Sequence, residues 1–442
     1  MISLCLIVRD EEERLRACIE SALPAVDEVV VVDTGSTDRT VEIARSLGAR
    51  CFRFAWRDDF SAARNHALDR ARGDWILVLD ADERLEEGAG DKVRAAAADG
   101  GKAGYFLRLV NFLDGGKRTE CLMLRFFVNR PEIRYRYLIH EQVLPDLLHH
   151  AQRTGEGLGE LPVRILHDGY LDHVMKDREK TARNRRLFLR QLALYPRDLY
   201  SWYKYAEFLR YHAPRDGEVL PALGRAWELF LETPERIART YPFAGEIAAL
   251  LGLELKETLG DPQAALAVLE EGTARCLPTP HLYFVKAGLE AEHLRFEEAL
   301  RDYRRCLEFH GRPFPVPVTE GVTSWKSLNG MGNCFLSMGD TVRAAACFEA
   351  SLRERPDQAE APAALAEIAY RRGDLRDALA RVEAILAHHP ANTNALRAGA
   401  AILRELGEED RADRWERRTA ELERSAAAEK QTTHVPPPPG RP

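Results

Sequence analysis

The chain has 442 residues, of which 45% are hydrophobic and 30% charged, so it is long enough for two or three domains with ordinary cores. Its formal net charge of -7 argues against nucleic acid as the main partner, because a polyanion requires a basic face. The eight cysteines include no Cys-x-x-Cys pair, a spacing that favours reduced thiols in a cytoplasmic protein over metal ligands or disulfides.

The first apolar run extends from Ile2 to Val8, with no basic residues before it and acidic residues after it. These flanks do not fit a signal peptide. No uninterrupted apolar segment of the sequence is long enough to span a membrane. We therefore expect this run to be the first strand of a domain without a membrane anchor.

Through about residue 175, short apolar runs alternate with amphipathic segments. Strand, helix and strand in that order imply right-handed crossovers and a mainly parallel sheet that is covered on both faces. Segments 104–114 and 121–129 are expected to add later, antiparallel strands. The first part of the chain is therefore predicted to be an α/β domain.

After about residue 176, the sequence becomes rich in Ala and Leu at helical spacing, and it repeats. Aligning residues 325–358 with 359–392 places Gly339 over Gly373, a period of 34 residues. Small residues fall where the two helices of a hairpin would touch, so the pattern resembles the tetratricopeptide repeat. An unrelated helical bundle is the alternative. Less regular copies are found at residues 293–309, 259–272 and 195–211.

Carboxylates follow two of the predicted strands. Asp80 and Asp82 come directly after the apolar run that begins at Trp75, and Asp33 follows the run "EVVVV". In an open parallel sheet, ligands bind beyond the carboxyl ends of the strands. Two such acids can share Mg²⁺ or Mn²⁺, which would in turn hold a diphosphate. Alternatively, Asp82 or Glu83 caps the next helix.

These residues also carry a family resemblance. The stretches "LCLIVRDEEERLRACIESA", "VDEVVVVDTGSTDRTVEIARSLGA" and "ARNHALDRARGDWILVLDADE" resemble the nucleotide-sugar half of family 2 glycosyltransferases, which have the GT-A fold. The resemblance implies transfer of a sugar from a nucleotide diphosphate donor with inversion at the anomeric carbon. It also implies a fold that is α/β and nucleotide-diphospho-sugar transferase-like, with a divalent metal as cofactor.

The resemblance assigns roles to several residues. Asp33 matches the acid that reads the base, usually uracil, whereas Thr34 stands where many members have a second acid. Asp80 and Asp82 match the metal-binding motif, and Asp80 would also border the donor. The pair Arg64 and Asn65 matches a motif near the donor pocket. The alternative is that both residues lie on the surface of a helix.

Two other functions fit less well. The turn after the first strand, "VRDEEER", has no glycine that would let a pyrophosphate approach the backbone, which disfavours the dinucleotide-binding fingerprint. A phosphatase of the haloacid dehalogenase type also uses Asp-x-Asp, but it would place Thr or Val where this chain has Arg84.

The acceptor side is predicted within residues 126–148. Inverting transfer requires a carboxylate that takes the acceptor proton. Glu141 is the candidate base, and His140-Glu141 resembles the pair in bacterial lipopolysaccharide-core and repeat-linked members. His140 would orient Glu141 or touch the acceptor, with an ordinary buried histidine as the alternative. His167, predicted after another short strand, matches a motif of the repeat-linked subset and would complete the metal shell or hold the diphosphate, unless it is structural.

The whole arrangement resembles peptide S-glycosyltransferases of bacteriocin pathways. The acceptor is expected to be a peptide, a protein or a cell-envelope glycan, and the repeats would suit an extended peptide or a homodimer. A repeat scaffold with a non-catalytic nucleotide-sugar-binding domain is the alternative. The predicted parts are a catalytic domain at 1–175, a helical linker at 176–240 with a degenerate repeat, the repeats at 241–424 and a disordered tail at 425–442.

Overall fold

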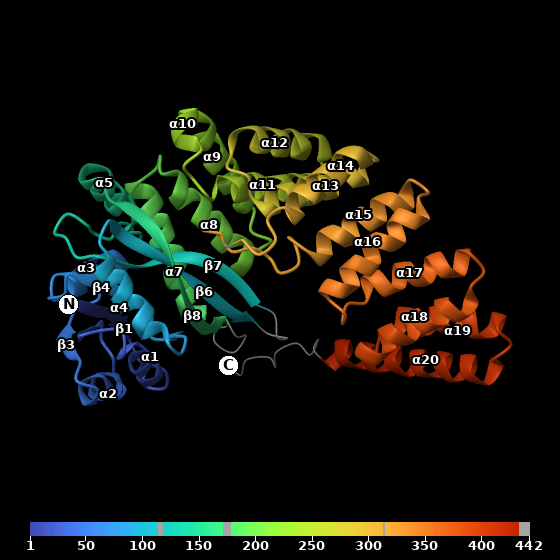
Figure 1. Ribbon diagram of the computed structural model, residues 1–442, viewed down its shortest axis with the longest axis horizontal. Coiled ribbons are helices and arrows are strands. Elements are labelled where there is room, and N and C mark those ends of the chain that lie inside the picture. Colours follow the sequence, from blue (N-terminus) through green and yellow to red (C-terminus); the bar gives the residue numbers. More distant parts are fainter. Residues whose placement is uncertain (114–117, 171–177, 313, 433–442) are drawn as a thin grey trace, which may run out of the picture. The chain divides into compact units, whose positions relative to one another are not determined.

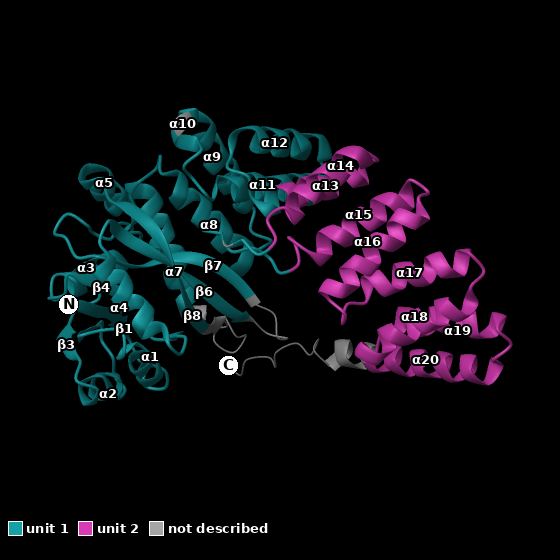
Figure 2. Cartoon of the chain, viewed as in Figure 1, with its two compact units in different colours: residues 1–282, 311–320 teal, residues 283–310, 321–442 magenta. Residues whose placement is uncertain are grey.

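The computed structural model describes residues 1–113, 118–170, 178–312 and 314–432 (Figure 1). The chain divides into two compact units, which Figure 2 shows in different colours. Unit 1 comprises residues 1–282 and 311–320, and unit 2 comprises residues 283–310 and 321–442. Unit 1 contains the β-sheet, and the described elements of unit 2 are helices.

One eight-stranded sheet, in the order β3-β2-β1-β4-β7-β6-β8-β5, organises unit 1. Its strands are β1 (Ile2–Val8), β2 (Glu28–Asp33), β3 (Arg50–Arg53), β4 (Trp75–Val78), β5 (Glu83–Leu85), β6 (Lys102–Leu113), β7 (Arg118–Val128) and β8 (Gly157–Tyr170). Strands β3, β2, β1 and β4 are parallel neighbours, as the alternation of strands and helices predicts. Strand β7 runs antiparallel to both β4 and β6, which confirms the predicted later strands.

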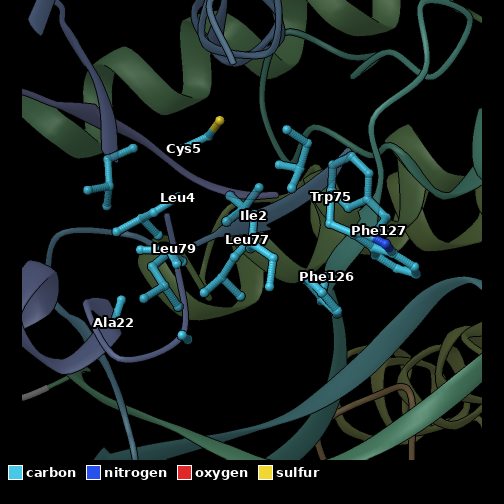
Figure 3. Packing of buried hydrophobic residues seen from close by; sticks show 14 of the residues in the cluster. Ile2, Leu4, Cys5, Ala22, Trp75, Leu77, Leu79, Phe126 and Phe127 are labelled. Carbon is cyan, nitrogen blue, oxygen red and sulfur yellow. The ribbon is translucent and has the colours of Figure 1, made fainter. Parts of the chain in front are cut away.

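The core of unit 1 lies along the central strands. Strand β2 contains a run of four valines, all buried, which is the pattern of a parallel strand covered on both faces. Figure 3 shows β1 residues Ile2 and Leu4 packed near Leu77 of β4 and Phe126 of β7. Trp75 stacks on Phe126 with 4.7 Å between ring centroids. This apolar core fixes the strand ends, which carry the polar residues described below.

Helices connect and cover the strands of unit 1. Helix α3 begins after Asp59, whose side chain accepts a hydrogen bond from the amide of Ala62 and thereby caps the helix. The helices packed with the sheet are α1 (Leu15–Ala22), α2 (Thr40–Ser46), α3 (Phe60–Leu68), α4 (Ala89–Asp99) and α5 (Leu144–Thr154).

A helical segment follows the sheet within the same unit. Its helices are α7 (Arg178–Leu194), α8 (Leu199–His212), α9 (Val219–Glu232), α10 (Glu235–Ala238), α11 (Ala244–Leu259), α12 (Pro262–Arg275) and the start of α13 (Pro280–Glu292). Residues 176–240 were expected to link two domains, whereas contacts group them with the sheet. The predicted domain boundaries rest on changes in sequence pattern, and the compact units divide at other positions. Those boundaries remain a prediction.

Unit 2 is a series of helix hairpins. Its remaining helices are α14 (Phe296–Leu307), α15 (Trp325–Ser337), α16 (Thr341–Glu354), α17 (Glu360–Arg371), α18 (Leu375–His388), α19 (Thr393–Glu405) and α20 (Glu409–Thr432). Gly339, Gly373 and Gly407 share left-handed φ values of 81°, 81° and 77°, so the 34-residue period repeats a backbone turn that favours glycine. A Cβ at Gly332 would lie 2.7 Å from the Phe348 ring, which confirms close helix contact there.

A short segment between α14 and α15 belongs to unit 1. The amide of Leu122 on β7 donates a hydrogen bond to the carbonyl of Phe314, at 2.6 Å, and Glu120 pairs with Val318 as an antiparallel bridge. Residues 311–320 therefore extend the hydrogen bonding of β7. The sequence analysis did not anticipate this pairing.

Three other expectations concern the whole chain. All eight cysteines are free thiols, as predicted. Among the described residues, no helix combines the length and the apolar character needed to cross a membrane. Helix α20 continues to Thr432, past the predicted start of the tail at residue 425, and the rest of that tail lies outside the described residues.

Candidate active site

The acids predicted at the strand ends do lie there. Asp33 is the last residue of β2, and Asp80 follows β4 by two residues. Asp33 is buried, and its Oδ1 accepts hydrogen bonds from the amides of Gly35 at 3.3 Å and Ser36 at 2.8 Å. Gly35 has φ 116°, a conformation that favours glycine. The Asp33 carboxylate thus shapes the loop that follows β2.

Asp80 lies between two guanidinium groups. Its Oδ1 accepts a hydrogen bond from Arg64 Nη2 at 2.6 Å, and its Oδ2 accepts one from Arg125 Nη2 at 2.9 Å. Dehydration opposes ionisation of the carboxyl, but the two arginines outweigh it and hold the pKa of Asp80 well below its usual range. Asp80 is therefore a fixed negative charge between two fixed positive charges.

Glu83 completes this group from within a strand. Its Oε1 accepts a hydrogen bond from Arg125 Nη2 at 2.6 Å, and its Oε2 accepts one from the amide of Asp80 at 2.9 Å. Burial raises the pKa of Glu83 to about 6, against the lowering effect of Arg125. The alternative that Asp82 or Glu83 caps a helix is wrong, because Glu83 starts β5 and helix α4 begins only at Ala89.

Asp82 lies close to a histidine of β8, the strand that pairs with β5. His167 Nε2 is 3.4 Å from Asp82 Oδ2, and His167 Nδ1 is 2.8 Å from Asn111 Oδ1. Because the Asn111 amide donates to Thr119 through Nδ2, its Oδ1 is left to accept from His167 Nδ1–H, so Nε2 faces Asp82. Burial lowers the pKa of His167, but Asp82 reverses this and raises it above its usual value.

The position of His167 differs from the prediction. It lies within the 14-residue strand β8 rather than after a short strand. The register of β8 places His167 opposite Glu83 of β5 on one side and opposite Asn111 of β6 on the other. Strand pairing therefore brings His167 to the carboxylates, although 85 residues of sequence separate it from Asp82.

Arg64 joins the two sides of the site. It lies on α3 and is buried, so the alternative of a helix-surface residue is wrong for it. Besides its bond to Asp80, Arg64 donates through Nε to Glu141 Oε1 at 2.5 Å. The adjacent Asn65 exchanges two hydrogen bonds with the backbone of Tyr135, at 2.8 and 2.9 Å. Asn65 therefore fastens the chain before Glu141, while Arg64 contacts Glu141 itself.

His140 and Glu141 lie on the loop between β7 and α5. The Glu141 side chain is only 11% exposed, so its charge is balanced mainly by Arg64. The His140 ring stacks on Phe188 of α7 with 5.4 Å between centroids. Desolvation by the surrounding protein, together with the nearby charge of Lys204, lowers the pKa of His140 to about 4, so its imidazole is neutral at pH 7.

Sequence reasoning missed two charged residues of this site. Arg125 is a single charge within the apolar run "CLMLRFFV". A charge in such a run is expected to be buried with a charged partner, and this expectation could have pointed to Arg125. Glu11, in the acidic loop after β1, has a pKa raised to about 7 by burial and by Asp82. Across the described residues, no group of three or more His, Cys, Asp or Glu side chains is arranged to hold a metal ion.

Two family models match this chain. Residues 3–153 match the model of glycosyl transferase family 2, a range that contains every site residue described above except His167. Residues 335–414 match a tetratricopeptide repeat model, over helices α16 to α19. The strand-end acids and the repeat hairpins therefore fall within separately recognised domains.

Three relatives illustrate the range of similarity. A TPR repeat-containing protein of Synechococcus elongatus is 41% identical over 201 residues, which are 45% of this chain and 50% of that protein. An uncharacterised glycosyltransferase of Rickettsia typhi is 34% identical over 112 residues, 25% of this chain and 38% of the relative. Glycosyltransferase SunS of Bacillus subtilis is 35% identical over 83 residues, 18% of this chain and 20% of SunS. The chain thus spans half or less of each relative, and it combines a family 2 glycosyl transferase domain with tetratricopeptide repeats.

Proposed function

We propose that this protein is a metal-dependent, inverting glycosyltransferase. It would move a sugar from a nucleotide diphosphate sugar to a peptide, a protein or a cell-envelope glycan. The observation that carries the proposal is the pair of hydrogen bonds that Arg64 makes to Asp80 and to Glu141. They bring together an acid from the donor side and the candidate base from the acceptor side.

Glu141 is proposed as the general base. Its carboxylate is largely buried and forms an ion pair with Arg64. A diphosphate beside Asp80 would offer Arg64 another anion, which would release Glu141 to take the proton of the acceptor as the acceptor attacks the sugar. Arg64 would then balance charge on the leaving diphosphate. The neutral His140 ring beside Glu141 is available to contact the acceptor.

The cation is proposed to be Mn²⁺ or Mg²⁺, held by Asp82 and His167. A carboxylate and an imidazole converge here, and Asn111 orients the imidazole as an outer-shell partner does. A bound ion of this kind would stabilise negative charge on the departing diphosphate. Two protein ligands suffice where substrate phosphates and water supply the others. Asp80 would join the shell only if Arg64 or Arg125 released one of its oxygens.

The donor is proposed to be a UDP-sugar, with Asp33 facing the base. Asp33 uses Oδ1 for the loop amides, which leaves Oδ2 for a ring N–H of the base. On the acceptor side, the repeats favour a polypeptide, because repeat surfaces suit extended chains. Self-association through the repeats and action in the cytoplasm remain part of the proposal.

A donor-hydrolysis screen tests this function. The full chain is incubated with a panel of nucleotide sugars and Mn²⁺ or Mg²⁺, and the released nucleotide diphosphate is measured. We expect one UDP-sugar to be hydrolysed only when the cation is present. Absence of hydrolysis and of cation-dependent donor binding across the panel would contradict the proposal, and binding without hydrolysis would favour the scaffold alternative.

Asp82→Asn sharpens the screen. The variant should abolish hydrolysis and weaken Mn²⁺ binding, measured by calorimetry, because it removes a charged ligand while keeping the side-chain shape. Asp91→Asn is the matched control, since Asp91 is exposed on α4 and should leave both quantities unchanged. Full activity of Asp82→Asn would refute the metal assignment.

A further inference from the structure

The loop that carries Glu141 has an unusual backbone. Arg136 and Gln142 close it through two backbone hydrogen bonds, at 2.9 and 3.0 Å. Between them, Tyr137 and His140 adopt left-handed φ values of 78° and 52°, which non-glycine residues with large side chains rarely adopt. Such a conformation persists only where the surrounding structure holds it. The source of that support is therefore informative about Glu141.

Helix α7 holds the loop immediately before Glu141. The amide of Ile139 donates a hydrogen bond to Gln191 Oε1 at 3.1 Å, in a buried setting. Gln191 is fully buried, and its Nε2 donates to Ser201 Oγ at 2.9 Å. Phe188, on the same helix, stacks on His140. Because the Gln191 amide has a partner at each end, its orientation is fixed.

Helix α8 holds the loop on both sides of Glu141. Asp198 caps the helix, accepts from Ser201 Oγ at 2.6 Å and also accepts from the hydroxyl of Tyr137 at 3.1 Å. Beyond Glu141, Gln142 Nε2 donates to the hydroxyl of Tyr200 at 2.9 Å. The bonds of Ile139, Gln191, Ser201, Asp198 and Tyr137 thus form a continuous path that leaves the loop and returns to it.

We infer that α7 and α8 are part of the catalytic machinery, with Gln191 and Tyr200 as positioning residues that hold Glu141 against Arg64. The inference rests on the proposed function and extends it to a segment outside the matched family domain, which ends at residue 153. Gln191 acts on the residue two positions before Glu141, and Tyr200 acts on the residue directly after it. Neither is assigned any contact with the donor.

The test is a double-mutant cycle in the full chain. Tyr200→Phe removes the hydroxyl that Gln142 contacts, and Gln191→Met removes both hydrogen bonds of a buried amide while keeping its length. Each should lower kcat for hydrolysis of the UDP-sugar found in the screen by about tenfold to a hundredfold, because a small misplacement of a reacting group is costly. The KM and the affinity for the donor should stay within about twofold.

The decisive measurement repeats both substitutions in a Glu141→Gln background. If the two residues act through Glu141, they should cause no further loss of the residual rate, whereas a general structural defect would still reduce it. Tyr205→Phe is the matched control, because Tyr205 also lies on α8 but its hydroxyl donates to Glu218, which is not part of the loop. This control should keep the rate of the wild type.

The outcomes separate this inference from the proposed function. A Tyr200→Phe variant as active as wild type, in a protein that Glu141→Gln inactivates, would overturn the positioning role alone. A further loss of the residual rate in the Glu141→Gln background would also overturn the positioning role. If Gln191→Met proves unstable, Tyr200→Phe alone decides the test, because it removes only a hydroxyl and keeps the ring. Full activity of Glu141→Gln would remove the proposed base and this inference together.

Discussion

One buried polar cluster from each unit can be compared, and the two clusters are built differently. In unit 1, the charged cluster comprises Arg64, Asp80, Glu83, Arg125 and Glu141, which exchange ion pairs of 2.5 to 2.9 Å. In unit 2, the amide cluster comprises Asn329, Ser351 and Gln358, which are neutral and buried.

The difference indicates what each cluster does. Gln358 in the amide cluster accepts from Asn329 at 2.8 Å and donates to Ser351 Oγ at 2.9 Å, so it joins three consecutive parts of the repeat array at little electrostatic cost. Burying charges costs far more than burying amides, and apolar residues of similar volume often stabilise a fold as well or better. The charged cluster of unit 1 therefore favours a role in chemistry over a role in stability.

The largest expected effect is on catalysis in the charged cluster. Glu141→Gln should lower the rate of single-turnover transfer by about 10²- to 10⁴-fold, the usual range for a general base. Donor affinity in the presence of Mn²⁺ should change little, because proton abstraction occurs only on the way to the transition state. Loss of donor binding would instead assign Glu141 to the metal or diphosphate shell. An unchanged rate would give the base role to another residue.

A second test removes one charge from the same cluster. Arg125→Met should destabilise unit 1 by about 3–5 kcal/mol, because it leaves Asp80 and Glu83 close together and without a shared cation. Hydrogen exchange, measured separately over the sheet and over the repeats, should show faster opening in the sheet alone. Equal protection of the sheet in the wild type and in Arg125→Met would mean that Arg125 does not offset the cost of burying Asp80 and Glu83.

The corresponding change in the amide cluster should be smaller. Gln358→Met removes the acceptor of the Asn329 amide and the donor to Ser351 Oγ, at a cost of about 1–3 kcal/mol to unit 2, with donor hydrolysis unchanged. Gln263→Met is the control for the same substitution at an exposed position: Gln263 lies on α12 in unit 1 and should change the stability of that unit by no more than about 0.5 kcal/mol. A change in hydrolysis from Gln358→Met would break the distinction between the two clusters.

A last test concerns pH. The pKa of His140 falls from 6.5 to about 4 on folding, so between these values the unfolded chain binds more protons than the folded one. The native state therefore loses stability as pH falls through this window. His140→Asn, which tolerates the left-handed backbone, should lessen this loss in urea unfolding compared at pH 7 and pH 4.5. An identical pH dependence in both proteins would contradict the shift.

Much of the fold could be predicted from local patterns. The valine run of β2 identified a covered parallel strand, and the recurrence of Gly339 and Gly373 identified the helix hairpins. Both signals lie in short stretches of sequence, because burial and backbone conformation are local properties there. The positions of Asp33 and Asp80 followed directly, since a strand's end is read from the same pattern.

Other features depend on pairing between distant segments. The sequence could propose His167 as a ligand of the cation, but its place inside β8 is set by the register with β5 and β6. Arg125 was missed because an apolar run hides a single charge. Helices α7 and α8 have ordinary helical periodicity, which shows that one face is buried but not which residues it is buried against.

The segment at residues 311–320 has a consequence for how such proteins can be recombined. The chain passes between the two units after residues 282, 310 and 320, rather than once. Exchange of the repeats for those of another protein by a single crossover would separate Phe314 and Val318 from the β7 residues that they pair with. A functional chimera would have to carry this ten-residue stretch together with its own sheet. The two units are therefore less easily exchanged than the difference between their sequence patterns suggests.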